Sequence, residues 1–148
     1  MSKNIDLFNK QTAQILAILW ENFPVLQEIS YAEFGAELPE NYVKNLGWGN
    51  ESIPENTVEL RRVIDGTFNF LGENGYIKYK SDGWFSFNDV RLTEKGLAVL
   101  EIKLESLGGK ETMGDRIISA VKDGTPAVIA GAVTNILSLG VNLITSGH

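Results

Sequence analysis

The sequence predicts a mainly α-helical protein with a small antiparallel β-ribbon, an α+β fold. Between residues 57 and 107 the apolar residues first recur at spacings of three and four, then alternate with polar residues, then return to the helical spacing. The first pattern is typical of an amphipathic helix and the second of a half-buried strand. A further helix is predicted over 126–145, which has no charged residue and follows a typical helix start.

The chain before residue 56 is predicted to begin with a helix over 5–23, ended by Phe23-Pro24. Its apolar stripe consists of Ile5, Phe8, Thr12, Ile15 and Leu19, widened by Leu16 and Trp20. After it, 27–29 reads as a short strand, and short helices are expected over 31–38 and 42–46. A loop rich in Gly and Asn, with Pro54, then leads to the next helix.

The helix that begins near residue 57 has an inner and an outer face. Asn56 is the expected N-cap, because Glu59 three residues later can bond back to its N–H. Gly75 is placed to end the helix in a left-handed conformation. The inner face consists of Leu60, Ile64, Thr67, Phe68 and Leu71, and the outer face of Glu59, Arg62, Gly66, Asn69 and Glu73.

The ribbon that follows reverses at Ser81-Asp82-Gly83, which has turn chemistry. In its first strand Ile77 and Tyr79 are expected to be buried and to alternate with exposed Tyr76, Lys78 and Lys80. In the second strand Phe85 and Phe87 share one side, and Val90 and Leu92 resume after an irregularity at Asn88-Asp89. Thr93 then caps a helix whose apolar seam is Leu97, Leu100, Leu104 and Leu107.

This order of elements resembles the winged-helix family of helix-turn-helix domains. The resemblance rests on Phe70-Leu71 before Gly75-Tyr76-Ile77, and on the string VRLTEKG (residues 90–96) that leads into Leu97 and Leu100. It implies a winged-helix-like domain over 1–107, with its second helix within 31–46. It also implies a recognition surface for DNA or protein on helix 57–74 and wing 76–92. The contact residues expected there are Arg61, Arg62, Lys78, Lys80 and Trp84.

The charge distribution disfavours DNA as the partner. The net charge is −6 and the isoelectric point is about 4.8. Residues 21–59 hold eight carboxylates against Lys44 alone, and DNA binding draws on phosphate neutralisation by Lys and Arg. The cations after residue 60, including Arg91 and Lys95, can form a basic patch for backbone contact. Alternatively, they only offset neighbouring carboxylates on a solvated surface.

The sequence indicates no catalytic or metal chemistry, so we expect a protein that is not an enzyme and has no cofactor. It contains no Cys, and its single His is residue 148, so a thiolate site or a His-based triad has no residues to form it. No phosphate-binding Gly-rich motif follows a predicted strand. The first ten residues have no apolar signal region, which makes a cytoplasmic location the default expectation.

Residues 108–148 are predicted to be a helical appendage that begins at Gly108-Gly109, with one helix over 113–122 and another over 126–145. The second helix is long enough to span a membrane, although it has a polar stripe. It is interpreted as a core or subunit-interface helix, as a membrane-inserting helix, or as a docking site. Self-association is the leading interpretation, through Gly131, Asn135, Leu139 and Asn142.

These observations favour a non-enzymatic regulatory or adaptor protein that recognises its partner through the winged domain and self-associates through its C-terminal helices. The alternative is a membrane-active effector whose C-terminal helix inserts into a bilayer. A purely structural assembly subunit is a third interpretation.

Overall fold

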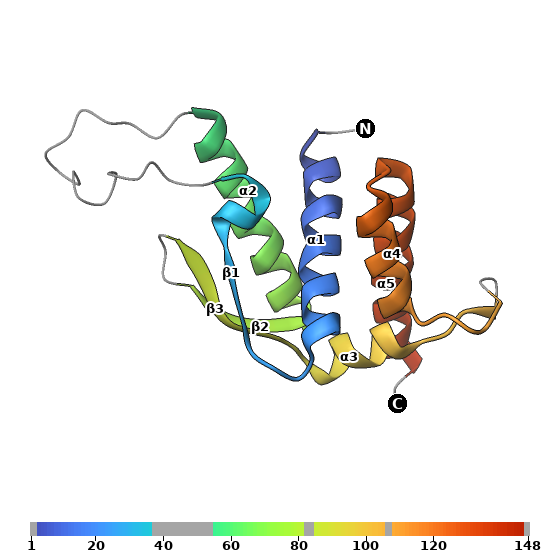
Figure 1. The fold of residues 1–148 in the computed structure, drawn as a ribbon. Coiled ribbons are helices and arrows are strands. Elements are labelled where there is room, and N and C mark those ends of the chain that lie inside the picture. Colours follow the sequence, from blue (N-terminus) through green and yellow to red (C-terminus); the bar gives the residue numbers. More distant parts are fainter. Residues whose placement is uncertain (1–2, 37–54, 82–84, 106–107, 147–148) are drawn as a thin grey trace, which may run out of the picture.

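Helix α1 (Lys3–Asn22) lies in the middle of the fold (Figure 1). On one side it packs against α2 (Glu55–Glu73) and the sheet, and on the other against α4 (Met113–Asp123) and α5 (Pro126–Ser146). The structure is a computed structural model that describes residues 3–36, 55–81, 85–105 and 108–146. The expected α+β class is confirmed, because helices and one small antiparallel sheet make up the described part.

The central position of α1 explains its burial pattern. Ile15 and Leu16 are fully buried, and so are the polar side chains of Gln11 and Thr12, because neighbours cover this helix on two sides. Ile5, expected in the apolar stripe, is instead half exposed in the first turns of the helix. The buried centre of α1 therefore joins the two halves of the protein.

The sheet has the strand order β1-β3-β2, so the last strand in the chain is the central one. Strand β1 (Gln27–Ser30) confirms the short strand expected there, and β2 (Ile77–Ser81) and β3 (Ser86–Leu92) form the expected ribbon. The irregularity expected at Asn88-Asp89 is also present. Asp89 has a φ of +53°, and the pairing register of β3 shifts beside it on both edges.

Three expectations about local structure are wrong. Helix α2 begins at Glu55, so Asn56 lies in its first turn and is not its N-cap. Phe85 precedes β3 and is half exposed, whereas only Phe87 is buried. Tyr76, expected on the exposed face, is buried, because its ring lies under α5 and its hydroxyl donates to the carbonyl oxygen of Leu137 at 3.4 Å.

The elements on either side of the ribbon are shorter than expected. Of the helix expected over 31–38, the described residues 31–36 form only a 3₁₀ turn, η1 (Tyr31–Phe34), and the helix expected over 42–46 lies outside the described residues. Helix α3 (Glu94–Glu101) is capped by Thr93 as expected, whose hydroxyl accepts from the Gly96 N–H at 3.0 Å. It ends before Leu104, since Ile102 has an extended backbone and Lys103 forms a bridge with Thr112.

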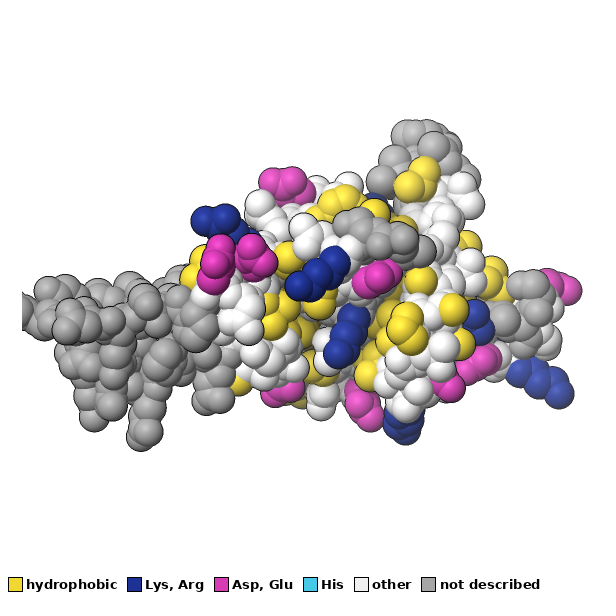
Figure 2. All heavy atoms as spheres, turned by 90° about the horizontal axis from the view of Figure 1, so that it is seen from above, with side chains coloured by type: hydrophobic (Ala, Val, Ile, Leu, Met, Phe, Trp, Pro, Cys, Tyr) yellow, Lys and Arg dark blue, Asp and Glu magenta, His cyan; other side chains and the backbone are white. Residues whose placement is uncertain are grey.

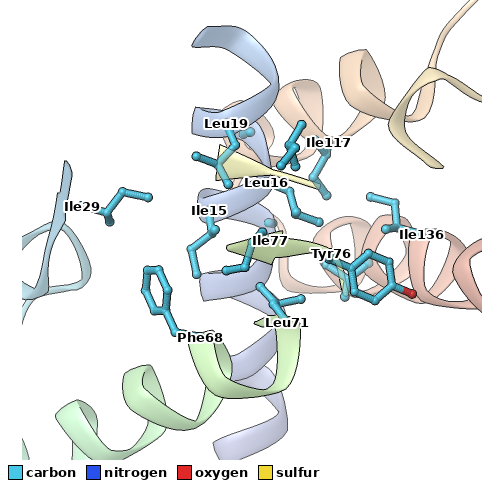
Figure 3. Close-up of a cluster of buried hydrophobic side chains, with 14 of the residues drawn as sticks. Ile15, Leu16, Leu19, Ile29, Phe68, Leu71, Tyr76, Ile77, Ile117 and Ile136 are labelled. Carbon is cyan, nitrogen blue, oxygen red and sulfur yellow. The ribbon is translucent and has the colours of Figure 1, made fainter. Parts of the chain in front are cut away.

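Helices α4 and α5 belong to the same hydrophobic core as the rest of the protein. Gly124 ends α4 in a left-handed conformation, and Pro126 begins α5, both as expected. Figure 3 shows Ile117 of α4 and Ile136 of α5 pointing toward Leu16 and Tyr76. The backbone does turn at the expected boundary, where Gly108 and Gly109 have positive φ angles, but the buried side chains on both sides of it form one continuous cluster.

Candidate recognition surface

The outer face of α2 forms a ridge that the inner apolar face of the helix holds in place. Ile64, Phe68 and Leu71 are fully buried, which fixes the rotation of the helix about its axis. Five residues are consequently exposed along the outer face, as expected: Glu59, Arg62, Gly66, Asn69 and Glu73. Of the three charged residues among these five, Glu59 and Glu73 are carboxylates and Arg62 is a cation, so the ridge is acidic overall.

Arg61 lies away from this ridge and holds the turn η1 against α2. Its guanidinium carbon is 3.7 Å from the centre of the Tyr31 ring, within the range of a cation–π contact. The Tyr31 hydroxyl donates a hydrogen bond to the Asp65 carboxylate. Burial, reinforced by this bond and by the negative charge of Asp65, raises the pKa of Tyr31 well above its usual 10.0. Arg61 is therefore half-buried in a structural contact rather than presented to a partner.

Arg62 is exposed at a groove between the N-terminal halves of α1 and α2. The groove has a volume of about 610 Å³ and is lined by Asn4, Phe8, Glu59, Arg62, Val63, Gly66 and Thr67. At its base the Thr67 hydroxyl lies 2.8 Å from the Gln11 side-chain oxygen, while the Gln11 amide nitrogen is buried without a hydrogen-bond partner among the described residues. Gly66 leaves open space in this groove, because nothing lies within 4 Å of the position of a Cβ there.

Lys78 and Lys80 lie together in a second groove, on the other side of the ridge. This groove measures about 430 Å³ and is lined by Asn69, Gly72, Glu73, Ile77, Lys78, Tyr79, Lys80 and Arg91. Lys78 and Arg91 are direct cross-strand partners, which places two like charges side by side. The pairing concentrates positive charge where α2 meets the ribbon.

Asp89 offsets part of that positive charge. Its carboxylate is 3.7 Å from the Lys80 ammonium, and its backbone carbonyl accepts from the Arg91 guanidinium at 2.7 Å. Both partners of the ion pair are well exposed, so the pair is weak. Lys78 is exposed beside them.

The structure thus separates the residues that the sequence grouped. It brings Lys78 and Lys80 together with Arg91, places Arg62 in a different groove, and uses Arg61 to hold Tyr31. Trp84 lies outside the described residues. Adjacent residues of an α-helix point about 100° apart, a signal that could have separated Arg61 from Arg62 in advance.

The surface seen from the end at which α1 begins carries mixed charge. Figure 2 shows Lys and Arg side chains interspersed there with Asp and Glu, and hydrophobic side chains between them. Among the described residues, no three His, Cys, Asp or Glu side chains gather in a way that could hold a metal ion.

The four residues expected to mediate self-association lie on one flank of α5. Gly131 and Asn142 are exposed, and Asn135 and Leu139 are half-buried. The opposite side of α5 packs into the core through Ile129, Val133 and Ile136. The core-facing side of the helix is therefore covered by α1, α3 and α4, whereas the apolar Val128 and Val141 on its outer side are exposed.

One helix of the described chain is long and apolar enough to cross a membrane, namely α5 over Pro126–Leu143, with 28% of that window buried. In the folded protein its outward positions include Thr134, Ser138 and Asn142, which are polar. The exposed side of α5 also carries the apolar Val128 and Val141, while Ile129, Val133 and Ile136 face the core.

Comparison of this chain with protein-family models, with curated proteins and with solved structures finds no match.

Proposed function

We propose that this protein is a non-enzymatic regulatory or adaptor protein, built on a winged-helix-type domain that recognises a partner protein through α2 and the β2–β3 ribbon. The observation that carries the proposal is the arrangement of α2 beside the ribbon. The acidic ridge lies between two grooves, one with an exposed Arg62 and one with Lys78, Lys80 and Arg91.

The order of elements supports the winged-helix assignment. A helix, a strand, a further helix and a β-hairpin follow one another, and the hairpin adds to the first strand through β3. The helix before the hairpin, α2, presents its outer face to solvent directly beside β2.

Charge favours protein over DNA as the partner. The ridge holds Glu59 and Glu73 against Arg62, and a phosphate backbone laid along it would meet mainly carboxylates. A partner protein can present charges that complement both the carboxylates and the cations of this surface. Charges at the rim of an interface set its specificity and association rate. The three cations beside β2 support a second candidate, non-specific DNA binding through the ribbon alone.

A site-specific photocrosslinker tests the proposal in cells. Placed at the exposed Asn69, which lines the groove beside β2, it is expected to capture a defined partner protein. Arg62→Glu with Lys80→Glu is expected to reduce that capture at least tenfold. The matched control is Lys3→Glu with Lys110→Glu, which changes the net charge equally at exposed positions elsewhere.

Titration of a labelled mixed-sequence DNA duplex tests the second candidate. Three phosphate contacts limit the slope of log affinity against log salt to about −2.7. Salt-dependent binding that Lys78→Glu with Lys80→Glu abolishes and the control pair retains would replace protein with DNA as the partner. The absence of both a crosslinked protein and DNA binding would refute the recognition surface.

We further propose that the protein self-associates through the exposed flank of α5. The flank carries Gly131, Asn135, Leu139 and Asn142 without any charge, and small residues allow close helix approach. Light scattering of the full chain is expected to give a discrete oligomer, which Gly131→Arg with Asn135→Arg converts to a monomer. Ala98→Arg, at an exposed position of α3, is the control and leaves the oligomer intact. A monomeric wild-type chain would contradict self-association.

A further inference from the structure

A narrow apolar groove lies between the C-terminal half of α1, the turn η1 and α4. Its volume is about 210 Å³, and its lining is Gln14, Ala17, Ile18, Glu21, Glu33, Phe34, Ile118, Val121 and Lys122. Four large apolar side chains form its walls: Ile18, Phe34, Ile118 and Val121. Each is half-buried, so each still exposes apolar surface to the groove.

The walls of the groove are held firmly. Phe34 packs edge-to-face against the fully buried Phe68, with ring centres 6.2 Å apart. Helix α4 is packed against α1 through Ile117, which is fully buried one position before Ile118. The groove is therefore preformed, and a ligand would not need to order it first.

The rim of the groove has unneutralised negative charge. Glu21 and Glu33 are both exposed, and neither takes part in a salt bridge within the described part of the chain. Lys122 is the one cation among the lining residues that the structure describes. An apolar floor between two carboxylates matches a partner that presents an apolar side chain flanked by basic ones.

We propose that this groove is a docking site for a basic, amphipathic segment of a partner protein, which inserts one large apolar side chain between α1 and α4. The volume equals that of about seven water molecules, below the range of about 300–1,000 Å³ that small-molecule sites occupy. A single side chain anchor suits this size. A second copy of the chain, with net charge −6, is less suited to an acidic rim.

The test uses the full chain and three labelled helical peptides of defined composition: one of leucine and lysine, one of leucine and glutamate, and one of serine and lysine. The leucine–lysine peptide is expected to bind saturably in fluorescence anisotropy. The other two are expected to bind at least tenfold more weakly, since one lacks the positive charge and the other lacks the apolar anchor. Backbone amide shifts on titration are expected to cluster at Ile18, Phe34 and Ile118.

Charge reversal at the rim separates specific docking from attraction to an acidic protein. Glu21→Lys with Glu33→Lys is expected to weaken binding of the leucine–lysine peptide about tenfold. Two exposed ion pairs with the peptide are lost, and each is replaced by a repulsion between like charges. The matched control, Glu101→Lys with Glu105→Lys, reverses two exposed carboxylates at and just after the end of α3 and is expected to change the affinity less than twofold.

Four results would overturn the proposal. In the first, the two charge-reversal pairs weaken binding equally. In the second, the amide shifts cluster on α2 or the ribbon. In the third, the leucine–glutamate peptide binds as tightly as the leucine–lysine peptide. Amide shifts at Ile18 and Ile118 that depend on protein concentration without peptide would also overturn it, because a second copy would then fill the groove.

Discussion

Two glycines of α5 give opposite expectations when each is replaced by alanine. Within a helix, alanine is favoured over glycine by about 1 kcal/mol. At Gly131 a new Cβ meets nothing within 4 Å in the described part of the single chain, so Gly131→Ala is expected to stabilise the monomeric protein by about that amount. At Gly140 the Cβ would overlap the Tyr76 hydroxyl and lie 2.7 Å from its Cζ and 2.9 Å from its Cε1.

The Tyr76 ring cannot move aside cheaply, because it is only 3% exposed and lies within the core. Overpacking of this kind typically costs about 1–3 kcal/mol, which exceeds the propensity gain. Gly140→Ala is therefore expected to destabilise the protein by about 1 kcal/mol net, and the two variants to differ by about 2 kcal/mol. For a chain of this length that difference corresponds to about 4–8 °C in Tm.

Urea and thermal unfolding of the two variants measure this difference. Tyr76→Phe removes the hydroxyl that meets the new Cβ, so Gly140→Ala is expected to cost less in the Tyr76→Phe background, a positive coupling in a double-mutant cycle. If Gly140→Ala stabilised the protein as much as Gly131→Ala, α5 would not pack on Tyr76, and the single core described above would be refuted.

Three further substitutions test individual contacts. Thr93→Ala removes the hydroxyl that accepts from the Gly96 N–H and is expected to cost about 1 kcal/mol in urea unfolding; a neutral result would contradict its role as the cap of α3. Gln11→Met removes a buried amide nitrogen that has no hydrogen-bond partner among the described residues, and it also removes one hydrogen bond to Thr67. The substitution is expected to be neutral or to stabilise the protein by up to about 1 kcal/mol. A loss of stability above that amount would show that the amide nitrogen has a partner. The raised pKa of Tyr31 means that the folded state favours its protonated form, so its contribution to stability is complete below pH 10.0 and is lost as the pH rises above that value. Tyr31→Phe is therefore expected to flatten the decline of stability at alkaline pH. An unchanged slope of stability against pH would contradict the pKa shift.

The parts of the fold that the sequence predicts correctly depend on local signals. The inner face of α2 follows from spacing along one helix, and the Thr93 cap follows from a hydroxyl before a helix. The end of α4 at Gly124 and the start of α5 at Pro126 follow from a left-handed residue and a helix-start residue next to each other. Each of these needs only the residues within one or two turns.

The errors come from contacts between residues far apart in the chain. Tyr76 alternates with Lys78 as an exposed strand residue would, but its partner at Leu137 is 61 residues away. Similarly, Arg61 is placed by Tyr31 on η1, which periodicity in α2 does not reveal.

The same limit applies to the candidate site. Lys78 and Lys80 share one face of a strand, so alternation alone places them together. Arg91 joins them only through the pairing register of the ribbon, and that register shifts between Lys78 and Lys80. The groove between α1 and α4 combines residues from three separate elements, and no pattern within any one of them indicates it.

The central position of α1 has a consequence for synthesis on the ribosome. Helix α1 is complete at residue 22, but the helix that closes its far side ends at residue 146. At typical elongation rates the two events are separated by roughly 6–25 s. During that interval the nascent chain exposes the apolar side of α1 that α4 and α5 later cover, a natural target for chaperones that bind emerging chains. Ribosome-bound chains stalled before and after α5 leaves the exit tunnel are expected to differ sharply in protease resistance.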